Sequence, residues 1–211
     1  EWDVNAAGVL RVCCCRKVCR SCNDKIGIGA CPLCRLPLGS DAEQLARLRR
    51  HVENEVPEAI ASLGSAYRRG LYGLVKSDKK AAKIWKRAVE LGNVEAIINL
   101  GSLYETGSGV KLDKKKAERL YRAAVDRGNA VAQSNLGAVL HSEEKFEEAV
   151  RYFVLAANQG YTSAESNLGV CYMRGEGTEV DLDKARYWFE RAAAKGHKTA
   201  TRLLAELDAR V

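Results

Sequence analysis

Apolar residues recur at helical spacing along most of this chain, in a pattern that is written four times and begins a fifth time near the C-terminus. In each copy an alanine is followed four residues later by a leucine, which places both on one face of a helix. The alanines and leucines of this pattern are Ala59, Ala96, Ala132, Ala164 and Ala200, with Leu63, Leu100, Leu136, Leu168 and Leu204. Successive alanines are 36 or 37 residues apart, except that 32 residues separate the third from the fourth. A period of this size predicts a solenoid of helix pairs.

One copy, residues 96–128, shows what a single unit contains. Leu100 and Tyr104 belong to an apolar stripe on a first helix, and Ala117 and Tyr121 to a stripe on a second helix. Glycines between the two stripes supply a turn, and the glycine that ends the copy suits a left-handed helix cap. A single hairpin of this kind leaves apolar surface exposed, so we expect neighbouring hairpins to stack.

The recurring motif reads A-x-x-x-L-G-x-x-Y, a Gly-x-Gly-Val loop, D-x-x-K-A, an aromatic residue, an alanine pair and a glycine. It resembles the Sel-1-like repeats, which are close relatives of tetratricopeptide repeats, over residues 41–211. The third copy departs from the motif and reads His141-Ser-Glu-Glu-Lys145 in place of the glycine loop. The resemblance implies an all-α helical-hairpin solenoid that binds protein. We expect a degenerate leading helix, four repeats and a C-terminal capping helix over residues 41–54, 57–92, 94–128, 130–160, 162–196 and 198–210.

Cysteines are concentrated in residues 11–38, where seven of the eight occur. Two Cys-x-x-Cys pairs, Cys19 with Cys22 and Cys31 with Cys34, have the spacing at which two thiolates of one turn bind zinc. The segment has few large apolar residues, so a metal would supply the stability that a core cannot. A disulfide framework is the competing interpretation, but it requires an oxidising compartment. The sequence therefore predicts Zn²⁺ bound by ligands drawn from Cys13, Cys14, Cys15, Cys19, Cys22, Cys31 and Cys34.

Residues 1–39 resemble the second half of a RING-type zinc finger, which ends here as Cys31-Pro-Leu-Cys34-Arg35. The resemblance implies a cross-braced arrangement in which two of the cysteines at 13–15 share an ion with the last pair. Cys13 and Cys15 would converge in an extended segment, whereas sequences of C-C-G-K-x-I-C type, found with Sel-1-like repeats in algal proteins, favour Cys13 with Cys14. Both choices stay open. The finger is partial, because residues 1–12 contain no cysteine or histidine for the upstream ligand pair.

By the same resemblance, Arg35 matches the linchpin position that fixes a conjugated ubiquitin, although a plain surface arginine is an equal interpretation. The resemblances to the zinc finger and to the repeats lead to two candidate functions. The first is a protein-interaction scaffold or adaptor, with a finger that binds zinc and a solenoid that binds partners. The alternative is a RING-type ubiquitin-protein ligase, in which the solenoid recruits substrate and the finger recruits a ubiquitin-conjugating enzyme. Neither needs a covalent catalytic residue in this chain, because a RING acts by positioning the thioester.

Three asparagines occupy one column of the repeat: Asn99, Asn135 and Asn167 each precede the Leu-Gly of a first helix. In tetratricopeptide arrays first helices line the concave groove, and asparagines at the corresponding position hydrogen-bond an extended peptide. The competing interpretation is a ladder in which the amides bond neighbouring helices of their own chain, as buried amides usually do. The sequence alone favours the ladder.

The amino-acid composition bears on which partners the protein binds and on where it is located. The 211 residues are 46% hydrophobic and 29% charged, and the net charge of +7 is spread over helix faces with Asp and Glu among the cations. That mixture favours solvated surfaces over nucleic-acid binding. No apolar run approaches the roughly 20 residues of a membrane span, and no signal segment occurs. We therefore expect an intracellular, cytoplasmic protein without a membrane partner.

Individual residues and the absence of known catalytic motifs lead to further expectations. The chain begins at Glu1 and its only methionine is Met173, so we expect it to be a piece of a longer protein. No nucleophile elbow, phosphate loop or H-E-x-x-H motif occurs. The three histidines are expected to be solvated, and Cys171 is expected to fill the core as a small apolar residue.

Overall fold

The computed structural model describes residues 9–11, 16–18 and 39–209. Strands β1 (Val9–Arg11) and β2 (Arg16–Val18) pair antiparallel, with Val9 opposite Val18 and Arg11 opposite Arg16. All seven cysteines predicted to bind zinc, together with Arg35, lie outside the described residues. The zinc-binding module therefore stays a prediction.

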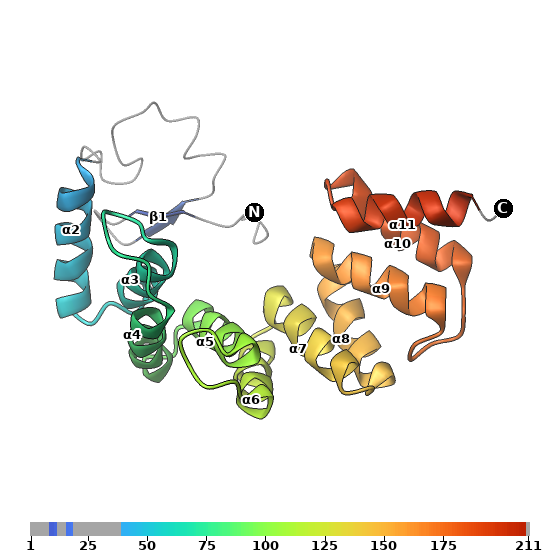
Figure 1. Ribbon diagram of the computed structural model, residues 1–211, viewed down its shortest axis with the longest axis horizontal. Coiled ribbons are helices and arrows are strands. Elements are labelled where there is room, and N and C mark those ends of the chain that lie inside the picture. The colour runs from blue at the N-terminus through green and yellow to red at the C-terminus, as the bar shows by residue number, and fades with distance from the viewer. Residues whose placement is uncertain (1–8, 12–15, 19–38, 210–211) are drawn as a thin grey trace. The chain divides into compact units, whose positions relative to one another are not determined.

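The described part of the chain after residue 39 is built from helices of 11 to 13 residues, joined by turns and loops (Figure 1). They are α2 (Asp41–Glu53), α3 (Pro57–Arg69), α4 (Asp78–Glu90), α5 (Val94–Thr106), α6 (Lys114–Val125), α7 (Ala130–Ser142), α8 (Phe146–Asn158), α9 (Thr162–Arg174), α10 (Leu182–Ala194) and α11 (Lys198–Asp208). The chain divides within α6 into two compact units, unit 1 (Glu1–Ala117) and unit 2 (Glu118–Val211). The prediction of an all-α solenoid of helical hairpins is confirmed for the repeats.

Unit 1 begins its helical part with α2, which packs against the first hairpin. Leu48 of α2 is fully buried and belongs to one cluster with Ala59 and Leu63 of α3. The start of α2 is fixed by a capping box, in which Glu43 N donates to Ser40 Oγ and Ser40 N donates to Glu43 Oε2 at 2.7 Å. This helix therefore extends the packed array.

Glycines of the first helices allow aromatic rings of the second helices to pack close. Gly64 lies against Trp85, whose Nε1 donates a hydrogen bond to the Ala61 carbonyl oxygen at 2.9 Å. In unit 2 a Cβ at Gly137 would come within 2.7 Å of Phe153 Cε1. A side chain at either glycine would push the ring out of its buried position, so the Leu-Gly pair of the motif serves packing.

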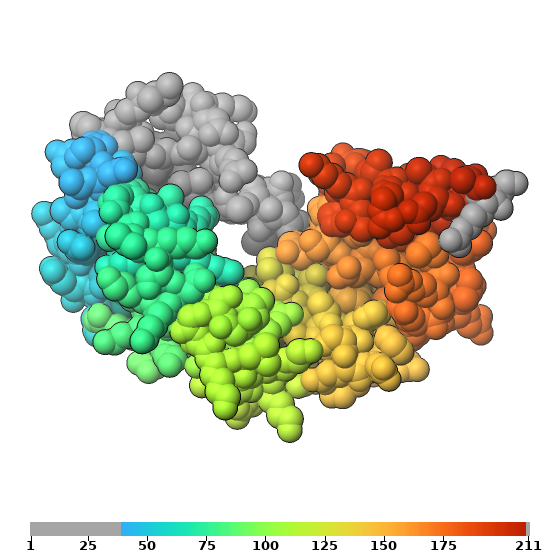
Figure 2. All heavy atoms as spheres, viewed as in Figure 1, coloured from blue at the N-terminus to red at the C-terminus, as the bar shows by residue number. Residues whose placement is uncertain are grey.

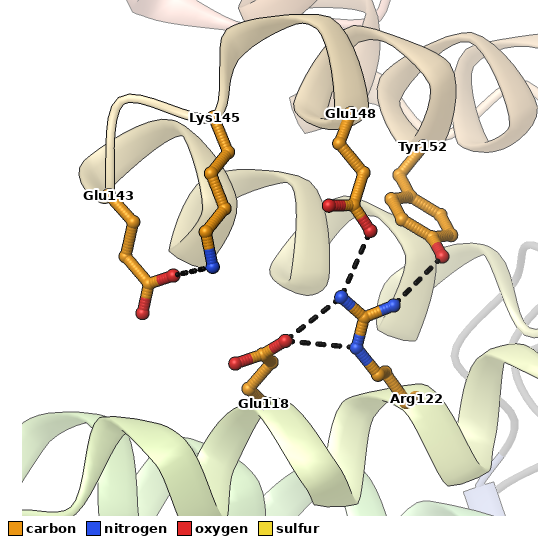
Figure 3. A network of polar contacts seen from close by, with 6 residues as sticks. All are labelled: Glu118, Arg122, Glu143, Lys145, Glu148 and Tyr152. Atoms are coloured by element: carbon orange, nitrogen blue, oxygen red, sulfur yellow. Dashed lines mark hydrogen bonds and ion pairs between the residues drawn. The ribbon is translucent and has the colours of Figure 1, made fainter.

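Unit 2 contains the hairpins α7–α8 and α9–α10, followed by α11. Leu203 and Leu207 of α11 complete the cluster around Phe189 of α10, and Figure 2 shows the atoms of α10 and α11 in close contact. On α6, Arg122 donates to Glu118 and to Glu148 of α8, both at 2.9 Å (Figure 3). Unit 2 is thus held by apolar clusters and by polar contacts between successive second helices.

The connections inside the hairpins differ in length, which matters for the site described next. Residues 70–77 connect α3 to α4, whereas only residues 143–145 connect α7 to α8. The short connection turns at Glu144, which has a left-handed φ of 61°. The third hairpin therefore lacks the loop that the first hairpin carries.

Candidate functional site

Each unit contains a cavity between two consecutive first helices. The cavity of unit 1, about 570 Å³, is lined from α3, α4, α5 and the loop before α4. Its lining residues are Ser65, Arg68, Arg69, Lys76, Asp78, Trp85, Glu95 and Asn99. The cavity is mainly polar, and charges of both signs line it.

Charged groups of the first cavity are held in place by the surrounding hairpins. The guanidinium of Arg68 lies 5.8 Å from the ring centroid of Trp85, within the range of a cation–π contact. Asp78 Oδ1 is buried and has no hydrogen-bond partner among the described residues. The loop of the next repeat lies on the backbone of Asp78 at Gly109, whose φ of +69° and lack of a Cβ permit that approach. Asp78 thus lines the cavity, while its Oδ1 is shielded from solvent.

The cavity of unit 2 is smaller, about 150 Å³, and lies between α7 and α9 with Phe153 of α8. Ala138, His141, Asn167 and Val170 complete its lining. This cavity is less charged than that of unit 1.

His141 does not have the solvated environment that we expected from the sequence. Its Nε2 lies 2.8 Å from Glu176 Oε2, and its ring meets Phe146 edge-on with centroids 5.0 Å apart. A carboxylate and an aromatic ring therefore orient the imidazole at the edge of the cavity.

The two cavities occupy the same place in the repeat. Asn99 and Asn167 each stand immediately before the first-helix leucine, and both are half-buried; Asn135 is half-buried at the same position of α7. Arg68 and His141 also match, since each lies five residues after the first-helix leucine. The sequence pattern identified the asparagines but not this second column, because Glu105 and Met173 occupy it in the other two repeats.

Two other predicted residues have structural places. Cys171 is 1% exposed, and burial raises the pKa of its thiol to about 11, so it is a neutral core residue as predicted. His197 corrects our expectation of a solvated ring. Its Nδ1 accepts a hydrogen bond from Ala200 N at 3.3 Å and caps the start of α11.

Metal ligands were predicted only in the N-terminal segment. Within the residues that the structure describes, no cluster of three or more His, Cys, Asp or Glu side chains is arranged to hold a metal ion. The predicted cysteines fall outside that search, so the prediction of zinc is untested by it. In the same described residues no helix combines the length and hydropathy needed to cross a membrane.

Stacked helical hairpins with matching cavities between their first helices define a helical-repeat protein of the tetratricopeptide-like class. A model of the Sel1 repeat matches residues 57–93, 94–129, 130–161 and 162–197. The chain therefore belongs to the Sel1 repeat family, as the motif predicts.

Relatives and solved structures agree with this assignment. The chain is 31% identical over 172 residues to the chitin synthase regulator SKT5 of Saccharomyces cerevisiae, a match that covers 78% of this chain and 25% of that protein. A Sel1 repeat protein from Oxalobacter formigenes superposes with a TM-score of 0.72 at 27% identity, covering 80% of this chain and 68% of that one. A protective antigen of uropathogenic Escherichia coli with the same fold gives 0.74 at 26% identity, covering 82% and 38%. The chain thus spans about a quarter of the curated yeast relative.

Proposed function

We propose that this chain is a protein-binding adaptor in which the first helices of each unit hold an extended segment of a partner. The observation that carries the proposal is that Asn99 and Asn167 line matching cavities between consecutive first helices. A side-chain amide offers one acceptor and two donors, which suit the carbonyl and N–H groups of an extended backbone. We assign the same role to Asn135, which occupies the same position on α7.

The family and the yeast relative support an adaptor. Helical solenoids present extended surfaces made of repeated positions, and these surfaces are used for binding. The yeast relative is named a regulator of chitin synthase, which is an action on another protein. By analogy, this chain acts on a partner protein and needs no catalytic residue of its own.

The position of the asparagines also favours a bound peptide over an internal ladder. A ladder would consume the amides in contacts between helices of the chain, which is the usual arrangement for fully buried amides. The three amides are half-buried, and two of them border open cavities. Asn99 and Asn167 are therefore within reach of a ligand.

The test uses a random-peptide library displayed on phage, selected against the full chain, with affinities of synthetic peptides measured by fluorescence anisotropy. We expect Asn99→Ala to weaken peptides that bind unit 1, and Asn167→Ala to weaken peptides that bind unit 2, each about 5- to 10-fold, because one hydrogen bond contributes about 1 kcal/mol. Asn158→Ala, at the exposed end of α8, is the matched control. Unchanged affinity in the variants would contradict the proposal, and a large fall in melting temperature would favour the ladder.

We also propose that the N-terminal cysteines bind Zn²⁺, on the basis of their two Cys-x-x-Cys spacings. Elemental analysis of the reduced protein, purified without chelator, should give at least one zinc per chain. Two would mean that the cysteines at 13–15 help to complete a second site, and a ubiquitination assay with a conjugating enzyme would then test the ligase hypothesis. A metal-free chain would contradict the zinc proposal and leave the adaptor function of the repeats unaffected.

A further inference from the structure

The two matching cavities differ in charge, although they share the asparagine. Arg68, Arg69 and Lys76 line the cavity of unit 1, where Asp78 and Glu95 leave one positive charge in excess. In unit 2 the position of Arg68 is taken by His141, and Ala138 and Val170 line the rest with Phe153 and the asparagine. The same groove position therefore presents different chemistry in the two units.

The length of the connecting loop explains much of this difference. The long connection 70–77 supplies Lys76 to the cavity of unit 1, and it leads into Asp78, the first residue of α4, which also lines the cavity. The connection 143–145 of the third hairpin is too short to line a cavity in this way. This accounts for volumes of about 570 Å³ in unit 1 and about 150 Å³ in unit 2.

We propose that the cavity of unit 1 binds an acidic side chain, Asp or Glu, of the partner segment held in the groove. This inference rests on the proposed function and specifies the partner. Arginine presents a fork of donors that matches a carboxylate, and Arg68 is half-buried over Trp85, where a charged pair is screened less than at an open surface.

The other charges of the cavity also fit a peptide. Asp78 lines the cavity, and a carboxylate is an acceptor that suits the N–H groups of a peptide. Asp78 and Glu95 would repel the continuous negative charge of a nucleic-acid backbone, whereas a peptide with one carboxylate avoids most of that repulsion.

The decisive experiment is a double-mutant cycle between the cavity and a selected peptide. We expect peptides selected from the phage library by the full chain to share an Asp or Glu at one position. Replacing that residue by Gln or Asn in a synthetic peptide should weaken binding about 10- to 100-fold, as loss of a charged hydrogen bond does. With Arg68→Ala or Arg69→Ala the same peptide change should have a much smaller effect.

Arg151→Ala removes the same charge from an exposed position on α8 and should leave the peptide preference unchanged. Arg69 is itself exposed, so its variant remains informative if Arg68→Ala disturbs Trp85.

The outcomes separate this inference from the proposed function. If selected peptides lack a shared acidic residue while Asn99→Ala still weakens them, the inference is wrong and the peptide groove stands. If no peptide is enriched at all, the proposed function and the inference both fail. If a short single-stranded oligonucleotide displaces the peptide and depends on the same arginines, the cavity binds phosphate, which overturns the inference.

Discussion

The two units fill one repeat position in opposite ways. The residue after the first-helix alanine is Ile60 or Ile97 in unit 1, with 1% and 5% exposure. In unit 2 the same position holds Gln133 and Glu165, which are as deeply buried. The fold therefore accepts either an apolar side chain or a polar one there, provided that the polar group is paired.

Unit 2 supplies the partners that its polar residues need. Glu165 is fully buried and accepts from Arg191 Nη2 at 2.9 Å and from Lys195 Nζ at 2.8 Å. Lys195 also donates to the Gly160 carbonyl oxygen, and Gln159 Nε2 donates to Gln133 Oε1 at 2.7 Å. Most of these contacts join the end of a repeat to its own first helix, and the bond from Lys195 to Gly160 joins two repeats. Unit 1 has apolar isoleucines at this position.

A second polar link in unit 2 joins α6 to α8. Arg122 is bonded to Glu118 and Glu148, and also donates to Tyr152 Oη at 3.3 Å (Figure 3). The hydrogen bond to Glu148 is the main cause that raises the pKa of Arg122 above its ordinary value. The comparison teaches that a substitution in one unit need not have the same effect at the matching position of the other.

The largest expected effect comes from placing the unit 2 residue in unit 1. Ile60→Glu puts a carboxylate at a position 1% exposed, without the two cations that Glu165 has. We expect a loss of about 4 kcal/mol or more in the free energy of unfolding, measured by urea unfolding. Ile60→Val, the control, should cost only about 1 kcal/mol. A small loss of unfolding free energy in Ile60→Glu would show that this apolar position accommodates a charged side chain.

Removing the cations from unit 2 tests the other side of the comparison. The double variant Arg191→Ala with Lys195→Ala leaves Glu165 buried and unpaired, so we expect a loss of about 3 kcal/mol. This figure is at the lower end of the usual range because both cations are more than a third exposed and solvent screens them. Adding Glu165→Leu should recover most of the stability in the same urea assay. A triple variant no more stable than the double one would contradict this account.

Glycine-to-alanine changes compare the aromatic packing of the units. Gly64→Ala forces a methyl group into the indole of Trp85, which is tied to Ala61, whereas Gly137→Ala meets the ring of Phe153. Overpacking costs about 1–3 kcal/mol, and we expect the change in unit 1 to be the larger because the indole also loses its hydrogen bond. Thermal unfolding measures the loss of stability in each variant. Adding Phe153→Leu to Gly137→Ala should restore most of the stability that the alanine costs. Equal losses would mean that the indole hydrogen bond adds little.

The periodicity predicted the fold well because it is a local signal repeated many times. The Ala and Leu columns identified the hairpins, and the asparagine column led to both cavities. The column of Arg68 and His141 was missed because its residue type changes from repeat to repeat. Lys76 reaches the cavity from a loop and Asp78 from the first position of α4, and helical periodicity describes neither placement. Similarly, Glu165 reads as a surface residue until its two partners from α10 and the following turn are seen.

The smallest expected effect concerns how the second helices begin. α4 is capped by the Ser77 hydroxyl, which does not titrate, whereas α10 is capped by Asp181, whose carboxylate accepts from Lys184 N at 2.9 Å. That backbone hydrogen bond is the main cause that lowers the pKa of Asp181. Because the folded pKa is depressed, the cap stabilises α10 above the ordinary Asp pKa of about 4 and loses this contribution as the pH falls below it. Asp181→Ser should therefore flatten the fall in melting temperature between pH 5 and pH 3, while Ser77→Asp should steepen it. If both variants keep the wild-type pH profile, acid does not act on the two units through these caps.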